Sequence, residues 1–172
     1  DERSREASQR SFVRLLQRGL AYQSEAPTMW DVDFQTALAQ AEIQDREIDG
    51  AYHRIRFDLA DDSGSVEIET SRPELIPACV ALVVNPQDER DRSLVGSNAR
   101  TPLIGAEVPI VAHELAEPDK GTGIAMICTF GDLTDVVWWR ELDLPARPVV
   151  GWDGRLHGNP PIAFETHRAN EH

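Results

Sequence analysis

The sequence predicts a mainly β fold with some α-helix, in which a β-barrel core carries peripheral helices. Two observations support this fold class. Alternating or continuously apolar segments of five to eight residues recur between residues 52 and 130, and glycines, prolines and polar turns separate them. Many short strands punctuated in this way are typical of a barrel or a strongly curved sheet, and only short helical patterns interrupt or flank them.

The composition indicates one soluble, cytoplasmic domain. The chain has 172 residues and a net charge of −13, from 30 acidic and 17 basic side chains. This acidity argues against extended contact with a phosphate backbone but allows a pocket that receives one nucleotide end. No apolar run approaches the roughly 20 residues of a membrane span, and the charged first residues are not a signal peptide. Cys79 and Cys128 form no CxxC pair, so we expect reduced thiols and no zinc site.

The first third of the chain is predicted to contain a helix and an extended linker. Residues 4–18 are amphipathic, with apolar side chains such as Leu15 and Leu16 on one face and Arg and Gln on the other. Gly19 suits the end of such a helix. Residues 34–39 are expected to form a short helix that runs into a strand.

A β-hairpin gives the clearest local pattern. Apolar and polar side chains alternate over residues 52–59 and again over 66–70, and turn residues at 61–64 join the two runs. Pro73 then ends the second strand or puts it at a sheet edge. The later expectations are a buried strand at 80–84, a short polar helix or turn at 88–96, strands at 100–104, 107–113 and 124–130, a helix at 132–142, a last hairpin around Asp153 and Gly154, and a frayed tail at 157–172.

The stretch from Gly121 to Asp135, GTGIAMICTFGDLTD, combines a glycine turn, an apolar strand and two acids at the start of a helix. Asp132 and Asp135 are explained by helix capping and by the helix dipole. They are also explained by a pocket for a cationic or hydroxylated ligand, and one acid can cap while the other faces the pocket. The glycines are no dinucleotide fingerprint, because a strand rather than a helix follows them.

Three further candidates have ordinary alternatives. Arg72, in Thr-Ser-Arg-Pro, can bind a phosphate or a carboxylate, or it can form a surface ion pair. Cys128 is either a nucleophile or a small apolar residue on a buried strand, with no histidine near it in the sequence. The five histidines are scattered and predict no metal site.

Four blocks of the sequence occur in the same order in one known family. They are EIETSRPELIPACVALVVNPQDER at 67–90, with its Thr-Ser-Arg-Pro-Glu and Pro-x-Asp-Glu-Arg motifs, and the segments at 26–45, 94–114 and 121–135. Together they resemble the class I aminoacyl-tRNA synthetases for valine. The HIGH and KMSKS signatures of the synthetic active site are absent from the sequence.

The resemblance implies that residues 1–172 form one editing domain, with the barrel fold of the valyl, isoleucyl and leucyl enzymes. Residues 1–44 are then the lead-in helix and linker from an absent catalytic domain, which uses ATP. Such a domain hydrolyses threonine wrongly attached to valine tRNA. A valine pocket rejects threonine only about a hundredfold, and these enzymes are the established example of that limit. The implied partners are the valine tRNA acceptor end and the rest of the same chain, with no membrane, metal or cofactor.

The resemblance also implies the site residues. Asp135 matches the aspartate that receives the substrate α-ammonium group, and Asp132 matches one on the threonine-reading side. Arg72 matches the arginine near the terminal adenosine, with Ser71 and Thr70 beside it. A charge-assisted contact from the carboxylate would hold the ester where a water can attack it.

The sequence departs from the family along the strand that leads to these acids. Met126 replaces a lysine, Cys128 replaces a threonine, and Thr129 begins a Thr-Phe-Gly segment in place of Pro-Ala-His. These three residues are the remaining expected substrate-binding positions. The alternative function is that of an insertion that binds the tRNA acceptor end with little or no hydrolysis. A third hypothesis is a thiol-dependent hydrolase that uses Cys128.

Overall fold

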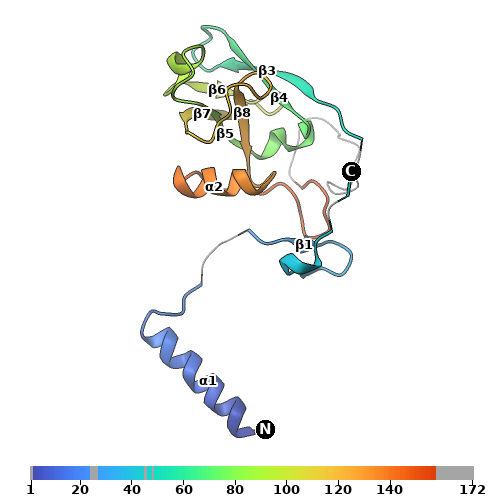
Figure 1. Ribbon diagram of the computed structural model, residues 1–172, viewed down its shortest axis with the longest axis vertical. Helices are drawn as coiled ribbons and strands as arrows, with labels where there is room; N and C mark the ends of the chain where they lie inside the picture. The colour runs from blue at the N-terminus through green and yellow to red at the C-terminus, as the bar shows by residue number, and fades with distance from the viewer. Residues whose placement is uncertain (1, 24–26, 45, 48, 158–172) are drawn as a thin grey trace.

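The computed structural model describes every residue except 1, 24–26, 45, 48 and 158–172 (Figure 1). The elements follow in the order α1 (Glu2–Gln17), β1 (Trp30–Asp31), β2 (Thr36–Ala37), η1 (Gln40–Glu42), β3 (His53–Leu59), β4 (Ser65–Thr70), η2 (Pro73–Ala78), β5 (Cys79–Val84), η3 (Arg92–Leu94), β6 (Asn98–Arg100), β7 (Glu107–Ala112), β8 (Ile124–Cys128) and α2 (Leu133–Glu141). The predicted tail lies outside the described residues, apart from its first residue.

Six strands form one curved sheet in the order β4-β3-β6-β7-β5-β8. All neighbours are antiparallel except β5 and β7. The two edge strands, β4 and β8, also contact each other, so the sheet nearly closes on itself. Figure 1 shows α2 lying outside this barrel-like sheet. The predicted fold class, a β-barrel core with peripheral helices, is confirmed.

The predicted hairpin is formed by β3 and β4, which pair from His53 with Thr70 to Asp58 with Ser65. Its alternation has the expected consequence, because Phe57 and Ile68 are fully buried while their sequence neighbours are exposed or half-buried. The strand β4 ends at Thr70 and lies at the sheet edge, and Pro73 begins η2 three residues further on, so the predicted end of the strand is confirmed.

The strand β5 is buried on both faces, which explains its uninterrupted run of apolar residues. Leu82 and Val84 pack into the interior of the barrel. Val80 and Val83 point to the outer face, where they pack with Ile127 of β8 and Trp138 of α2. The barrel wall therefore has a core on each side, and α2 covers the outer one.

The helix predicted at 34–39 is wrong. Residues 30–37 form a small hairpin, in which β1 pairs with β2. The carboxylate of Asp31 accepts hydrogen bonds from the backbone N–H groups of Asp33, at 2.9 Å, and Phe34, at 2.8 Å. An aspartate that closes a turn in this way competes with helix formation.

The strand predicted at 100–104 is shorter and earlier, because β6 spans Asn98–Arg100. Thr101 is buried and its hydroxyl accepts a hydrogen bond from the N–H of Ala106 at 3.0 Å, so the chain turns at this point. Gly105 has a φ of +65°, as its predicted turn position requires. The last strand also stops early, at Cys128, while the helix predicted at 132–142 matches α2 within one residue at each end.

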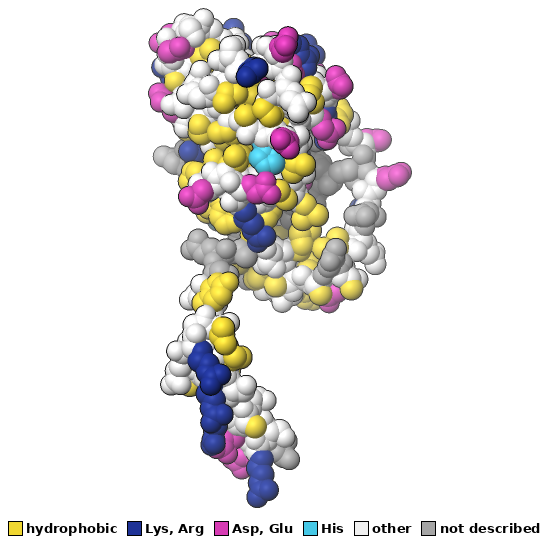
Figure 2. All heavy atoms as spheres, turned by 60° about the vertical axis from the view of Figure 1, so that its left-hand side comes forward, with side chains coloured by type: hydrophobic (Ala, Val, Ile, Leu, Met, Phe, Trp, Pro, Cys, Tyr) yellow, Lys and Arg dark blue, Asp and Glu magenta, His cyan; other side chains and the backbone are white. Residues whose placement is uncertain are grey.

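The small β1–β2 hairpin contacts the last hairpin of the described chain through two tryptophans. The indole N–H of Trp30 donates to the carbonyl of Trp152 at 2.9 Å, and the two rings pack with centroids 4.7 Å apart. Gly154 turns the last hairpin, in which Val150 bridges to Leu156. Figure 1 and Figure 2 show α1 projecting away from the rest of the described chain, and the described residues of α1 include none that is buried. Residues 1–44 as a lead-in segment stay a prediction.

Within the described ranges, no helix combines the length and the apolar character that crossing a membrane requires.

Candidate functional site

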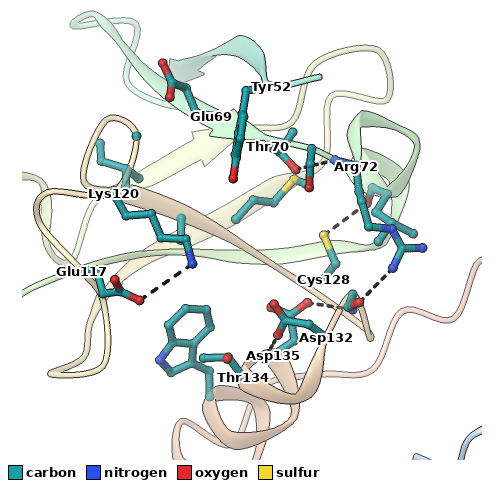
Figure 3. A pocket seen from close by; sticks show the side chains of 18 of the residues that line it. Tyr52, Glu69, Thr70, Arg72, Glu117, Lys120, Cys128, Asp132, Thr134 and Asp135 are labelled. Atoms are coloured by element: carbon teal, nitrogen blue, oxygen red, sulfur yellow. Dashed lines mark hydrogen bonds and ion pairs between the residues drawn. The ribbon is translucent and has the colours of Figure 1, made fainter. Parts of the chain in front are cut away.

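A cavity of about 390 Å³ lies where β4, β8 and the start of α2 meet (Figure 3). Its walls come from the turn after β4, the loop before β8, β8 itself and the first turn of α2. The lining side chains with polar or titratable groups are Tyr52, Glu69, Thr70, Ser71, Arg72, Glu117, Lys120, Cys128, Asp132, Thr134 and Asp135. Two segments that lie far apart in the sequence, at 69–75 and 115–138, therefore converge on one hollow.

The Gly-Thr-Gly turn brings the loop before β8 against β4. A Cβ atom at Gly121 would lie 3.0 Å from the Cβ of Glu69, and φ at Gly121 is +60°. At Gly123, φ is +87° and a Cβ would lie 2.9 Å from the carbonyl oxygen of Pro118. Both positions therefore require glycine for conformation and for space, and the turn closes one side of the cavity.

Asp135 puts a buried carboxylate into the cavity from the first turn of α2. Its side chain is only 5% exposed, and its Oδ2 accepts a hydrogen bond from the backbone N–H of Gly131 at 2.7 Å. Burial raises the pKa of Asp135 to about 6, while the hydrogen bond from Gly131 acts in the opposite direction. The group is therefore ionised at neutral pH but close to its titration range, which suits it to receive a cation or a proton.

Gly131 allows this close approach of the carboxylate. A Cβ atom at this position would lie 2.7 Å from Asp135 Oδ2 and 3.3 Å from a methyl carbon of Leu75. The carbonyl of the same residue accepts a hydrogen bond from Arg72 Nη1 at 2.8 Å, and Arg72 Nε donates to Glu74 at 3.1 Å. Arg72 thus lines the cavity, but two of its donors are already engaged, one with the carbonyl of Gly131 and one with the carboxylate of Glu74.

Asp132 caps α2, as one of the two interpretations of the acid pair predicted. Its Oδ1 accepts a hydrogen bond from the backbone N–H of Asp135 at 2.9 Å. The side chain also lines the cavity. The structure therefore gives Asp132 a capping role and a place at the site, and Asp135 the more buried position.

Thr70, the last residue of β4, lies on the side of the cavity opposite α2 (Figure 3), and Ser71, the next residue, also lines the cavity. The hydroxyl of Thr70 accepts a hydrogen bond from the backbone N–H of Arg72 at 3.0 Å. This bond shapes the turn that directs Arg72 toward Gly131.

Met126 and Cys128 make the wall that β8 contributes to the cavity. Cys128 is 2% exposed, and its thiol donates to the carbonyl of Leu75 at 3.4 Å. Burial raises the pKa of Cys128 far above its ordinary value, so the thiol stays protonated. A protonated, buried thiol is a poor nucleophile, which argues against the thiol-dependent hydrolase.

Thr129 was expected beside the substrate, but it is not among the described residues that line the cavity. Its hydroxyl accepts a hydrogen bond from the backbone N–H of Arg147 at 2.8 Å, and Arg147 Nη1 donates to the carbonyl of Cys79 at 2.6 Å. The physical reason is that β8 ends at Cys128. The side chain of Thr129 therefore fastens the segment after α2 to the barrel.

Tyr52, Glu117, Lys120 and Thr134 line the cavity without having been predicted as site residues. Tyr52 was assigned only to the alternating hairpin. One feature of the sequence could have marked Lys120 as a site residue, since it is the only lysine in the sequence and directly precedes the Gly-Thr-Gly turn. The described residues include no group of three or more His, Cys, Asp or Glu placed to hold a metal ion.

Comparison with known proteins defines the class of this chain. The model of a family described as tRNA synthetases class I (I, L, M and V) matches residues 1–165. The chain therefore belongs to the class I tRNA synthetase family.

Its similar relatives are valine–tRNA ligases. Those of Thermobifida fusca and Leifsonia xyli are 62% identical over 166 residues and 58% identical over 170 residues, which is 96% and 99% of this chain. The enzyme of Salinispora tropica is 63% identical over 161 residues, or 94% of this chain. The chain spans only 19%, 20% and 19% of the length of these three relatives.

Among solved structures, a ternary complex of Agrobacterium radiobacter K84 agnB2 LeuRS with tRNA and LeuAMS is similar, with a TM-score of 0.46 and 21% sequence identity. The match covers 56% of this chain and 16% of that one.

Proposed function

We propose that this chain is the editing domain of a valine–tRNA ligase and that it hydrolyses the ester of threonine wrongly attached to valine tRNA. The observation that carries the proposal is the buried carboxylate of Asp135 in a cavity of about 390 Å³. The identity of the chain to valine–tRNA ligases supports the choice of tRNA.

In the proposed reaction, Asp135 pairs with the α-ammonium group of the threonyl ester. A charge-assisted contact of this kind, made by a carboxylate that is only 5% exposed, fixes the ester relative to the cavity wall. A water molecule then attacks the ester carbonyl carbon. The bond from that carbon to the ribose oxygen breaks, the ribose oxygen takes a proton, and free threonine and uncharged tRNA leave. Water is the nucleophile, so the step needs no cofactor, and ATP is used elsewhere in the synthetase.

Selection of threonine over valine requires a group that forms a hydrogen bond with the side-chain hydroxyl of the substrate threonine. Asp132 and Thr134 are polar lining residues in the same turn as Asp135. A site built to pair a hydroxyl rejects the valyl ester, because valine would leave a buried polar group without a partner. We propose that Asp132, while capping the helix through Oδ1, uses its remaining acceptor capacity for this purpose.

A second candidate is a module that binds the tRNA acceptor end but hydrolyses slowly. The β8 wall favours it, because Met126 and Cys128 present a thioether and a protonated thiol to the cavity. Neither group can readily orient an attacking water.

Mischarged Thr-tRNA separates the two candidates. The full-length synthetase that contains this chain should deacylate it, and Asp135→Ala should slow deacylation at least about 30-fold, since removing one partner of a buried charge pair costs about 2 kcal/mol or more. Asp58→Ala is the matched control, because Asp58 is an exposed aspartate of β3 that pairs with Arg56. A wild-type protein that binds Thr-tRNA but leaves it intact supports the binding module. Equal rates in wild type and Asp135→Ala would remove Asp135 from the reaction.

A further inference from the structure

Two side chains at the mouth of the cavity have no part in the proposed hydrolysis. Tyr52 directly precedes β3 and is 76% exposed, although it lines the cavity. Lys120 lines it from the loop before β8. Figure 3 shows the phenol of Tyr52 and the ammonium group of Lys120 extending toward the hollow from different elements, with Asp135 on a third side.

Lys120 is the less engaged of the two basic residues that line the cavity. Its ammonium nitrogen lies 3.8 Å from a carboxylate oxygen of Glu117, and both side chains are 71% exposed. Such a pair is weak, because water screens it. Arg72 is instead engaged with Glu74 and with the Gly131 carbonyl. In a chain of net charge −13, a single accessible ammonium group gives an anion one favourable point of approach.

Tyr52 offers a flat aromatic face at the same cavity as that cation. Isolated exposed aromatic residues are ordinary on protein surfaces. This one differs in its place, because it stands at a cavity that also holds an accessible ammonium group and a buried acid. Aromatic faces combined with cations are how proteins bind single-stranded nucleic acid, since bases stack on the ring and phosphates pair with the cation.

We propose that Tyr52 and Lys120 together bind the single-stranded 3′ end of the tRNA, with Tyr52 stacking on a base and Lys120 pairing with a phosphate. The inference rests on the proposed function and adds two positioning residues to it. Both act on capture of the RNA end, while Asp135 acts on the aminoacyl group. Their substitution is therefore expected to change KM rather than kcat.

The test is deacylation of Thr-tRNA by the full-length synthetase, with kcat and KM measured at several salt concentrations. Tyr52→Ala should raise KM about tenfold, within the range for loss of one base–aromatic stack, and leave kcat unchanged. Tyr52→Phe keeps the ring and should keep the wild-type KM. Lys120→Gln should raise KM and reduce the slope of log KM against log salt by about 0.7, the value for one phosphate contact on a single strand.

The control for the cation is Arg56→Gln, because Arg56 is an exposed basic residue of β3 that pairs with Asp58 and does not line the cavity. It should leave both KM and the salt slope unchanged. Wild-type hydrolysis with unchanged KM in Tyr52→Ala and Lys120→Gln overturns this inference and leaves the proposed function standing. A Tyr52→Phe variant as weak as Tyr52→Ala overturns the stacking role. A wild type that leaves Thr-tRNA intact overturns the proposed function and, with it, this inference.

Discussion

A methyl group at Gly131 would collide with the carboxylate that we place at the centre of the reaction. The ideal Cβ position lies 2.7 Å from Asp135 Oδ2 and 3.3 Å from Leu75 Cδ1. Asp135 cannot move outward freely, because it is 5% exposed and accepts a hydrogen bond from Gly131 itself. Ordinary van der Waals contact begins at about 3.4 Å. Gly131→Ala must therefore displace the carboxylate by several tenths of an ångström or more, or shift the backbone.

Overpacking of this kind costs about 1–3 kcal/mol of stability, and for a domain of this size each kcal/mol lowers Tm by about 2–4 °C. A displacement of about 1 Å in a positioning group can cost on the order of a hundredfold in rate. We therefore expect Gly131→Ala to lose most Thr-tRNA deacylation while remaining folded. Deacylation kinetics and thermal unfolding measure the two effects.

Gly64→Ala is the matched control, because a Cβ at Gly64 would meet nothing within 4 Å. It should leave both the rate and Tm close to wild type. The reasoning about Asp135 is refuted if Gly131→Ala deacylates Thr-tRNA at the wild-type rate with an unchanged Tm.

Three further predictions concern the cavity side chains. Because the pKa of Asp135 is raised to about 6, the folded state holds its proton more tightly than the unfolded state, so this group's contribution to stability falls as pH rises through about 4 to 6. Asp135→Asn does not titrate, so in denaturant unfolding its stability relative to wild type should increase by up to roughly 3 kcal/mol between pH 4 and pH 7. Asp132→Ala should lose about 1 kcal/mol of stability through the lost cap, while Asp132→Asn keeps the cap. Asp132→Asn should lose threonine discrimination, measured as the ratio of the deacylation rates of Thr-tRNA and Val-tRNA, and a ratio equal to that of wild type would limit Asp132 to capping. Cys128→Ser should deacylate within about twofold of wild type, because the buried thiol is protonated; complete loss of activity in a folded variant would reinstate the thiol.

The sequence correctly predicted the elements that are set by the spacing of apolar side chains along the chain. The β3–β4 hairpin follows from strict alternation, and β5 follows from a short apolar run that is typical of a strand buried on both faces. The cap at Asp132 follows from its spacing to Asp135, since a side chain at the N-cap reaches the N–H three residues on.

The wrong predictions come from tertiary and local contacts that the spacing of apolar residues does not reveal. At 34–39 the helical pattern was overridden by two hydrogen bonds from backbone N–H groups to Asp31. At Thr129, the end of β8 one residue earlier directed the hydroxyl to Arg147 instead of the cavity. Tyr52 and Lys120 are 68 residues apart in the sequence and reach one cavity through sheet closure. No local pattern marks such a pair.

The position of Asp135 depends on a chain of contacts that crosses the cavity from β4 to α2. Glu74 orients Arg72, Arg72 donates to the carbonyl of Gly131, and the N–H of Gly131 donates to Asp135. Because the N–H and the carbonyl of Gly131 are both hydrogen-bonded, the Asp135 carboxylate is linked to groups that come from a different block of the sequence. An arginine in this position therefore acts on the site by orienting the acid, even without touching a substrate. Thr-Ser-Arg-Pro-Glu and Gly-Asp-x-x-Asp, which are about 60 residues apart in the sequence, therefore both contribute to the position of one buried carboxylate.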